Sequence, residues 1–174
     1  MKLTPLNIPD VIVIEPDVFE DERGFFFEAF NQKKFNDACG KNISFVQDNQ
    51  SFSKKGVLRG LHYQTEPYVQ AKLVRSIRGE IFDVALDIRE ESKTFGNWVS
   101  VILSEKNLKQ LWIPEGFAHG FYVLSEFAEV IYKTTEFYNK NAERVISYND
   151  SRFNIEWPID DSVIQSIKDK NISF

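Results

Sequence analysis

Short segments in which apolar and polar residues alternate recur along this chain, with polar turns between them at intervals of about 8–12 residues. Clear examples are 81–88 and 98–103. Further strands are expected at 11–14, 25–30, 45–53, 57–64, 71–75, 111–113, 127–135 and 144–148. Many short strands of this spacing predict an all-β sandwich or barrel of the jelly-roll type.

Two short helices are expected to interrupt the strands. Asn31 is placed to cap a helix over 32–38, and Gly40 to end it. A second helix is expected near the C-terminus, over 160–168. The 174 residues contain no repeat, linker or low-complexity segment, so we expect a single domain over 1–174.

Charge and cysteine content exclude several classes of protein. The net charge of −5 argues against nucleic acid as the main partner. Cys39 is the only cysteine, so an intrachain disulfide is impossible and a reducing compartment is indicated. No N-terminal run resembles a signal peptide, and no segment approaches the ~20 apolar residues of a membrane span. We therefore expect a cytoplasmic protein that does not enter a membrane.

The stretch 57–75 holds the strongest candidates for chemistry. His62 is one of two histidines, with Arg59 three residues before it and Lys72 ten residues after it. In a regular strand Arg59 and His62 would face opposite sides, so a bulge at Gly60 is needed to give them a common face. A neutral imidazole accepts a proton near pH 7, and the two cations can hold an anion. A structural histidine is the alternative, which the polar neighbours on these strands weaken.

The second histidine, His119, lies among residues that favour irregular backbone. Pro114, Gly116 and Gly120 predict a turn and a close backbone approach. A metal site is the minority alternative, because two histidines cannot supply a three-histidine set and no cysteine cluster replaces it. Donation to a bound phosphate or sugar and a structural role are equally good explanations of His119.

Other residues could complete a site around these two histidines. Arg23 and Lys168 are, with the cations of 57–75, candidates to bind a diphosphate, although surface cations are usually only solvated. Asp169 could orient the first histidine. Tyr132 is either a core tyrosine or a member of the site. Tyr138, in a loop-like segment, could stack on a flat ring.

Several motifs of this sequence resemble those of the dTDP-4-dehydrorhamnose 3,5-epimerase family. The most specific are GVLRGLHYQ at 56–64 and IPEGFAHGF at 113–121. The resemblance extends to 21–30, 47–53, 70–74, 79–89, 94–96, 130–138 and 167–169, and so covers nearly the whole chain. It implies a cupin-like double-stranded β-helix barrel that forms a homodimer and uses no metal or other cofactor.

The resemblance also implies a substrate and a role for each residue. The substrate is a dTDP-linked 4-keto-6-deoxyhexose, whose ketone acidifies the hydrogens on C3 and C5. His62 removes such a proton and is paired with Asp169. Lys72 lies near the enolate oxygen, and Tyr132 returns a proton on the opposite face. The implied substrate contacts are Arg23, Glu28, Gln47, Asn49, Arg59, His119, Tyr138, Glu143 and Lys168, with the tyrosine stacked on thymine.

The number of inverted carbons is left open by the sequence. Epimerisation at both C3 and C5, which yields dTDP-4-keto-L-rhamnose, is the leading hypothesis. A monofunctional 3- or 5-epimerase would use the same base and tyrosine. Two other classes remain as alternatives: a non-catalytic sugar-nucleotide binding module, and a metal-dependent cupin oxygenase or isomerase.

Overall fold

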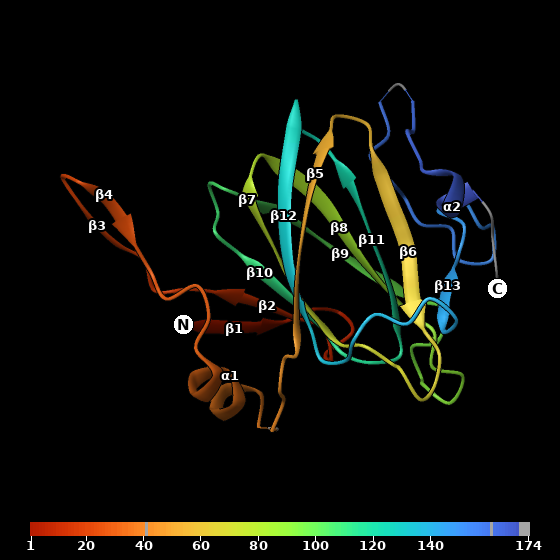
Figure 1. The fold of residues 1–174 in the computed structure, drawn as a ribbon, viewed down its shortest axis with the longest axis horizontal. Coiled ribbons are helices and arrows are strands. Elements are labelled where there is room, and N and C mark those ends of the chain that lie inside the picture. The colour runs from red at the N-terminus through yellow and green to blue at the C-terminus, as the bar shows by residue number, and fades with distance from the viewer. Residues whose placement is uncertain (41, 161, 171–174) are drawn as a thin grey trace.

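Two antiparallel sheets face each other in the computed structural model, which describes residues 1–40, 42–160 and 162–170 (Figure 1). The six-stranded sheet has the order β1 (Lys2–Pro5), β2 (Ile12–Glu15), β10 (Gln110–Ile113), β7 (Lys72–Arg78), β12 (Phe127–Thr134), β5 (Gln47–Lys54). The five-stranded sheet has the order β13 (Glu143–Val145), β6 (Leu58–Gln64), β11 (Phe117–Val123), β8 (Glu80–Asp87), β9 (Trp98–Ser104). This all-β, cupin-like architecture confirms the predicted fold class.

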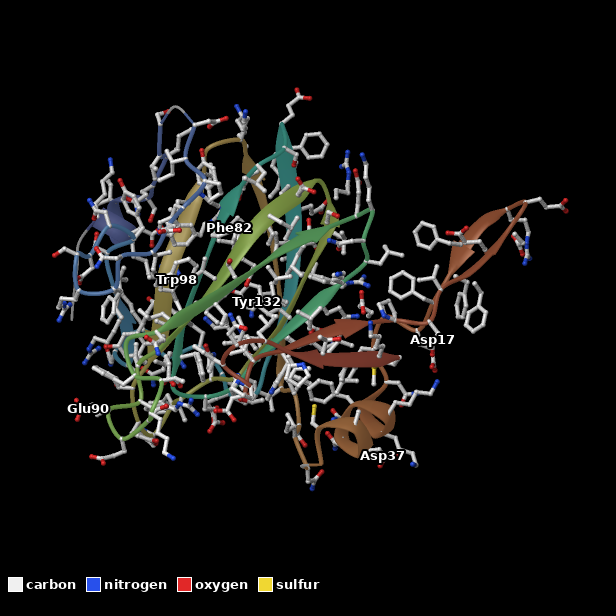
Figure 2. The ribbon with its side chains drawn as sticks, turned by 180° about the vertical axis from the view of Figure 1, so that it is seen from behind. Asp17, Asp37, Phe82, Glu90, Trp98 and Tyr132 are labelled. Atoms are coloured by element: carbon white, nitrogen blue, oxygen red, sulfur yellow. The ribbon has the colours of Figure 1, made fainter. Side chains whose placement is uncertain are left out.

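A hairpin of β3 (Phe19–Asp21) and β4 (Gly24–Phe26) stands clear of the two large sheets in both views (Figure 1 and Figure 2). The strand expected over 25–30 is therefore shorter than predicted, and most of it is not a strand. The exposed aromatic rings of the hairpin are Phe19, Phe25 and Phe26, each more than 60% accessible. An isolated two-stranded hairpin is only marginally stable in water, so we expect this one to be stabilised by a contact with another molecule.

Strand alternation builds a core on both faces of the five-stranded sheet. On β8, Ile81 and Ala85 point between the two sheets and join the main core. Val84 and Leu86 point to the outer face, where they pack under Phe153 from the C-terminal region. Since both faces of the sheet are buried at β8, the polar side chains of Asp83 and Asp87 on that strand are enclosed as well.

Helix α1 (Gln32–Cys39) forms where the sequence predicts it. The Asn31 side chain accepts a hydrogen bond from the Lys34 amide at 3.1 Å, and Gly40 ends the helix in the left-handed conformation with φ of 63°. Phe35 is the buried residue of α1, and it packs against Trp112 of the six-stranded sheet.

The helix expected over 160–168 is wrong over most of its length. Only α2 (Ile167–Lys170) is helical in the described part of this region. The preceding segment instead extends the edge of β6: Ile164 pairs with Val57, accepts from Leu58 at 3.0 Å and donates to Gly56 at 2.9 Å. Because the N–H and C=O groups of Ile164 are hydrogen-bonded to the sheet, they are not available for the hydrogen bonds of a helix.

The turn predicted from Pro114, Gly116 and Gly120 is present only before β11, and His119 lies within this strand, which the sequence did not predict. Every residue of β11 is buried, between β6 on one side and β8 on the other. Gly116 makes the turn before the strand, with φ of 82°. Gly120 provides the close backbone approach that the sequence predicts, because a Cβ there would lie 2.8 Å from the carbonyl oxygen of Arg59.

The bulge predicted on β6 is present. His62 pairs with His119 of β11, whereas Arg59 pairs with Phe121. Two residues of β6 therefore stand opposite one residue of β11, which shifts the phase of the strand. As a result both Arg59 and His62 line the space between the sheets, while the intervening Leu61 joins the outer core.

Replacing Gly60 with alanine is expected to destabilise the protein by more than the backbone strain alone, which is about 1–3 kcal/mol. Gly60 has φ of 112°, and a Cβ there would lie 2.6 Å from the His119 carbonyl oxygen. Gly24 has φ of 119°, and a Cβ there would meet no other part of the chain within 4 Å, so Gly24→Ala isolates the strain. Urea unfolding measures both variants. Equal losses of stability would show that the two strands tolerate a methyl group at the bulge.

Candidate active site

A cavity of about 250 Å³ opens between the two sheets. Most of the candidate residues, drawn from both sheets and α2, lie on its wall. They are Gln47, Asn49, Arg59, His62, Lys72, His119, Tyr132, Tyr138, Glu143 and Lys168. The fold therefore brings together side chains that lie far apart in the sequence.

His62 is bonded to a buried carboxylate. Its Nε2 lies 2.5 Å from Oδ1 of Asp169, which is 5% exposed. Burial is the largest single influence on the pKa of Asp169 and raises it, but the hydrogen bond and charge of His62, with smaller contributions from Ser166 and Lys168, together hold that pKa below its ordinary value. An ionised carboxylate on Nε2 places the proton of the neutral ring there, which leaves Nδ1 as the basic nitrogen.

The chain delivers Asp169 to this position through its C-terminal segment. The pairing of Ile164 with the edge of β6 fixes the approach, and the Asp169 amide donates to Ser166 Oγ at 3.1 Å. His62 and Asp169 are 107 residues apart in the sequence. The contact consequently depends on the docking of the last described residues rather than on the strand pattern around the histidine.

Lys72 is an almost fully buried cation at the cavity. Its Nζ donates to the carbonyl oxygen of His62 at 3.3 Å. Burial lowers the pKa of Lys72 to about 8, although the carboxylates of Asp83 and Glu143 act in the opposite direction. Lys72 is consequently an ammonium at neutral pH and loses its proton as the pH rises through about 8.

Tyr132 enters the cavity from the sheet opposite to that of His62. It lies on β12 and packs against the main core, and Figure 2 shows it inside the body of the molecule. Burial raises the pKa of Tyr132, so its phenol keeps a proton across the neutral range. An imidazole and a phenol thus approach one space from two sides, as a base and an acid acting on opposite faces of a ring would.

Three side chains are linked at the mouth of the cavity. Glu143 accepts from the Tyr138 hydroxyl at 2.9 Å and from Lys168 Nζ at 2.5 Å. The Lys168 ammonium also lies 5.6 Å from the centre of the Tyr138 ring. Tyr138 is half exposed, so one face of its ring is available for stacking.

Strand β5 adds a row of inward polar side chains. Gln47 donates to Asn49 at 2.8 Å, and Ser53 accepts from Arg59 Nε at 2.9 Å. Ser51 lies between them on the same face, and its hydroxyl is buried without a hydrogen-bond partner. Sequence reasoning missed Ser51, although the period of two that places Gln47 and Asn49 together also selects it.

Arg23 and Glu28 lie outside the cavity of their own chain. Arg23 is at the tip of the β3–β4 hairpin and pairs with Asp21. Glu28 pairs with Lys34 of α1. Within one chain, therefore, the structure does not bring these two candidates together with the others.

Metal ligation and membrane insertion find no support in the described residues. No group of three or more His, Cys, Asp or Glu side chains in the described ranges is arranged to hold a metal ion. Neither α1 nor α2 has the length and apolarity needed to cross a bilayer.

Comparison with known proteins decides the family. The family model described as dTDP-4-dehydrorhamnose 3,5-epimerase matches residues 5–174. This chain belongs to the dTDP-4-dehydrorhamnose 3,5-epimerase family. The resemblance in the motifs is thereby confirmed over nearly the whole sequence.

Members of the epimerase family are similar to this chain in both sequence and structure. The dTDP-4-dehydrorhamnose 3,5-epimerase of Shigella flexneri is 59% identical over 173 residues, which are 99% of this chain and 94% of the relative. A Legionella pneumophila family member, solved in complex with dTDP-4-keto-L-rhamnose, has a TM-score of 0.96 and 50% identity, covering 98% of this chain and 90% of its own. A 3'-monoepimerase from Streptomyces bikiniensis, in complex with dTDP-quinovose, is more distant, at 31% identity and a TM-score of 0.90, with 97% and 85% covered.

Proposed function

We propose that this chain epimerises dTDP-4-keto-6-deoxy-D-glucose at C3 and C5 to give dTDP-4-keto-L-rhamnose. The observation that carries the proposal is the placement of His62, held by Asp169, and Tyr132 on opposite sheets around one cavity. The identity of 50% or more to named 3,5-epimerases supports the same substrate.

Proton transfer in this scheme runs from one face of the sugar to the other. Nδ1 of His62 takes the proton from the sugar carbon next to the ketone. The C–H electrons form a double bond to C4, and the carbonyl electrons move onto the C4 oxygen, which becomes an enolate. Asp169 stabilises the imidazolium. The Lys72 ammonium donates to the enolate oxygen, a contribution worth ~3 kcal/mol for a preorganised donor. The Tyr132 phenol then protonates the carbon from the other face, which inverts it.

The nucleotide is expected to bind toward the mouth of the cavity. Arg59 is a fixed cation suited to a diphosphate, because Ser53 already orients its guanidinium. Tyr138 would stack on thymine, and Lys168 would add a second positive charge. Gln47 and Asn49 supply amides on the β5 side of the cavity.

Incubation with dTDP-4-keto-6-deoxyglucose in D₂O, followed by NMR, tests the proposal. Deuterium is expected at both C3 and C5, because each inverted carbon receives its new hydrogen from a group that exchanges with solvent. Deuterium at only one carbon would identify a monoepimerase. No exchange at either carbon would identify a binding module instead.

A homodimer is the assembly that we propose for this chain. The exposed phenylalanines of the β3–β4 hairpin form an apolar surface that a second copy would cover. In such a dimer the hairpin of one copy would bring Arg23 and Glu28 to the cavity of the other. That arrangement would account for two substrate contacts that lie outside the cavity of their own chain.

Mixing two inactive variants is expected to restore activity if the hairpin acts between chains. An Arg23→Ala chain keeps its own His62, and a His62→Asn chain keeps its own Arg23. One site of the mixed dimer would then have His62 from the first chain and Arg23 from the second. Activity is measured before and after the variants are unfolded and refolded together. Failure to regain activity, with mixed dimers present by mass spectrometry, would place Arg23 at the site of its own chain.

A further inference from the structure

A second buried carboxylate lies beneath the cavity, at Asp83 of β8. Its side chain is fully buried, on the face of β8 that points between the sheets with Ile81 and Ala85. Both of its oxygens lie 3.0 Å from Nε2 of His119. His119 itself lines the cavity, so Asp83 is one side chain removed from it.

No lysine or arginine of the described residues forms an ion pair with Asp83, whose partner is a histidine. Asp87, four residues further along the same strand and equally buried, pairs with Arg89 at 2.7 Å. A fully buried carboxylate is costly unless a positive charge compensates for it. The compensating charge for Asp83 therefore has to come from a nearby cation without direct contact.

Lys72 is the cation that meets this requirement, because its Nζ donates to the carbonyl oxygen of His62, and His62 pairs across the sheet with His119, which bonds to Asp83. Glu143, the other carboxylate that acts on Lys72, is already engaged, since it pairs with Lys168. Asp83 and Glu143 both raise the pKa of Lys72 against the effect of burial, and Asp83 is the stronger of the two. The remaining titratable groups on the cavity wall are Arg59, His62, Tyr63, His119, Tyr132 and Tyr138.

We propose that Asp83 is a positioning residue of this epimerase: it holds His119 in the tautomer with the proton on Nε2, and it keeps Lys72 an ammonium. The proposal rests on the proposed function for its kinetic consequences, whereas the tautomer follows from the contact itself. Both carboxylate oxygens can only accept, so the proton of the neutral ring lies on Nε2. Burial lowers the pKa of His119, which favours the neutral ring at pH 7.

This assignment changes what His119 can bind. In the tautomer with the proton on Nε2, Nδ1 is an acceptor without a proton. Phosphate oxygens are acceptors as well and gain nothing from such a nitrogen. The partner of His119 in the cavity is therefore a donor, and the sugar hydroxyl groups are the donors that the substrate offers.

Nitrogen-15 NMR of the imidazoles tests the tautomer without any need for activity. The chain has two histidines, so the spectrum of His62→Asn identifies the ring of His119. At pH 7 the wild type is expected to show a protonated Nε2 and an unprotonated Nδ1 for His119. In Asp83→Leu, which removes both acceptor oxygens, that pattern is expected to change, whereas Asp87→Asn should leave it in place. A proton on Nδ1 of His119 in the wild type would overturn the proposal.

The pH dependence of kcat/KM tests the effect on Lys72. In the wild type the basic limb is expected near pH 8, where Lys72 loses its proton. Removing the charge of Asp83 should move that limb to lower pH by on the order of one unit. Asp87→Asn is the matched control, because it removes a buried carboxylate from the same strand and should leave the limb in place.

The outcomes of these two experiments separate the possible failures. A uniform loss of rate in Asp83→Asn with an unmoved basic limb would show a structural role only, and would overturn the effect on Lys72. A wild-type chain without epimerase activity would overturn the proposed function, while the NMR measurement would still decide the role of Asp83 on His119.

Discussion

Replacing His62 with asparagine is expected to lower kcat by about 10³–10⁴-fold, the upper part of the range for a positioned acid–base group. Asparagine places a polar amide near the position of Nδ1, is too short to replace the contact of Nε2 with Asp169, and cannot accept the proton from carbon. The loss should appear in kcat because the imidazole acts on the sugar. Binding of dTDP, measured by calorimetry, should change by less than about threefold, since the nucleotide contacts lie toward the mouth of the cavity.

Solvent exchange provides the stricter test of this role. His62→Asn should incorporate no deuterium at C3 or C5, because the first C–H bond is not broken. Asp169→Asn should retain slow exchange, since the base remains but its imidazolium has lost the 2.5 Å contact with a buried carboxylate. A His62→Asn protein that exchanges either hydrogen within about tenfold of the wild-type rate would assign the base to another residue.

Many of the strands that carry this site could be predicted from the alternation of apolar and polar residues. The mismatch of phase between Arg59 and His62, with Gly60 between them, predicted the bulge that turns both toward the cavity. Alternation failed for β11, because a strand that is buried on both faces has no polar face to mark it. Alternation did identify β8 as a strand, but it did not predict that Asp83 would be buried, because both faces of that strand are covered.

Contacts between segments far apart in the sequence could not be predicted from the local pattern of residues. The pairing of Ile164 with the edge of β6 cannot be inferred from either segment alone, and it is this pairing that replaces the expected helix and delivers Asp169. The resemblance supplied the roles of the residues but not their placement within one chain. Arg23 and Glu28 show the difference, since they match the family motif while the fold of a single chain holds them away from the cavity.

Replacing Tyr132 with phenylalanine is expected to separate proton exchange from inversion. The base and the lysine remain, so His62 can still remove a proton, exchange it with solvent and return it to the same face. Inversion should fall by about 10²–10³-fold, because the opposite face has lost its donor. NMR of the recovered substrate in D₂O should then show deuterium with the original configuration, a result that no other variant considered above predicts.

Tyr122→Phe is the matched control for this experiment. Tyr122 is a buried tyrosine of β11 whose hydroxyl donates to Asp160 at 3.2 Å, and it does not line the cavity. Its loss should cost about 0.5–1.5 kcal/mol of stability for one hydrogen bond and leave inversion and exchange coupled. Inversion at the wild-type rate in Tyr132→Phe would assign the second proton to another donor. Loss of exchange together with inversion, with dTDP binding intact, would show that the phenol is needed before the first proton is removed, and the order of steps proposed here would have to be reversed.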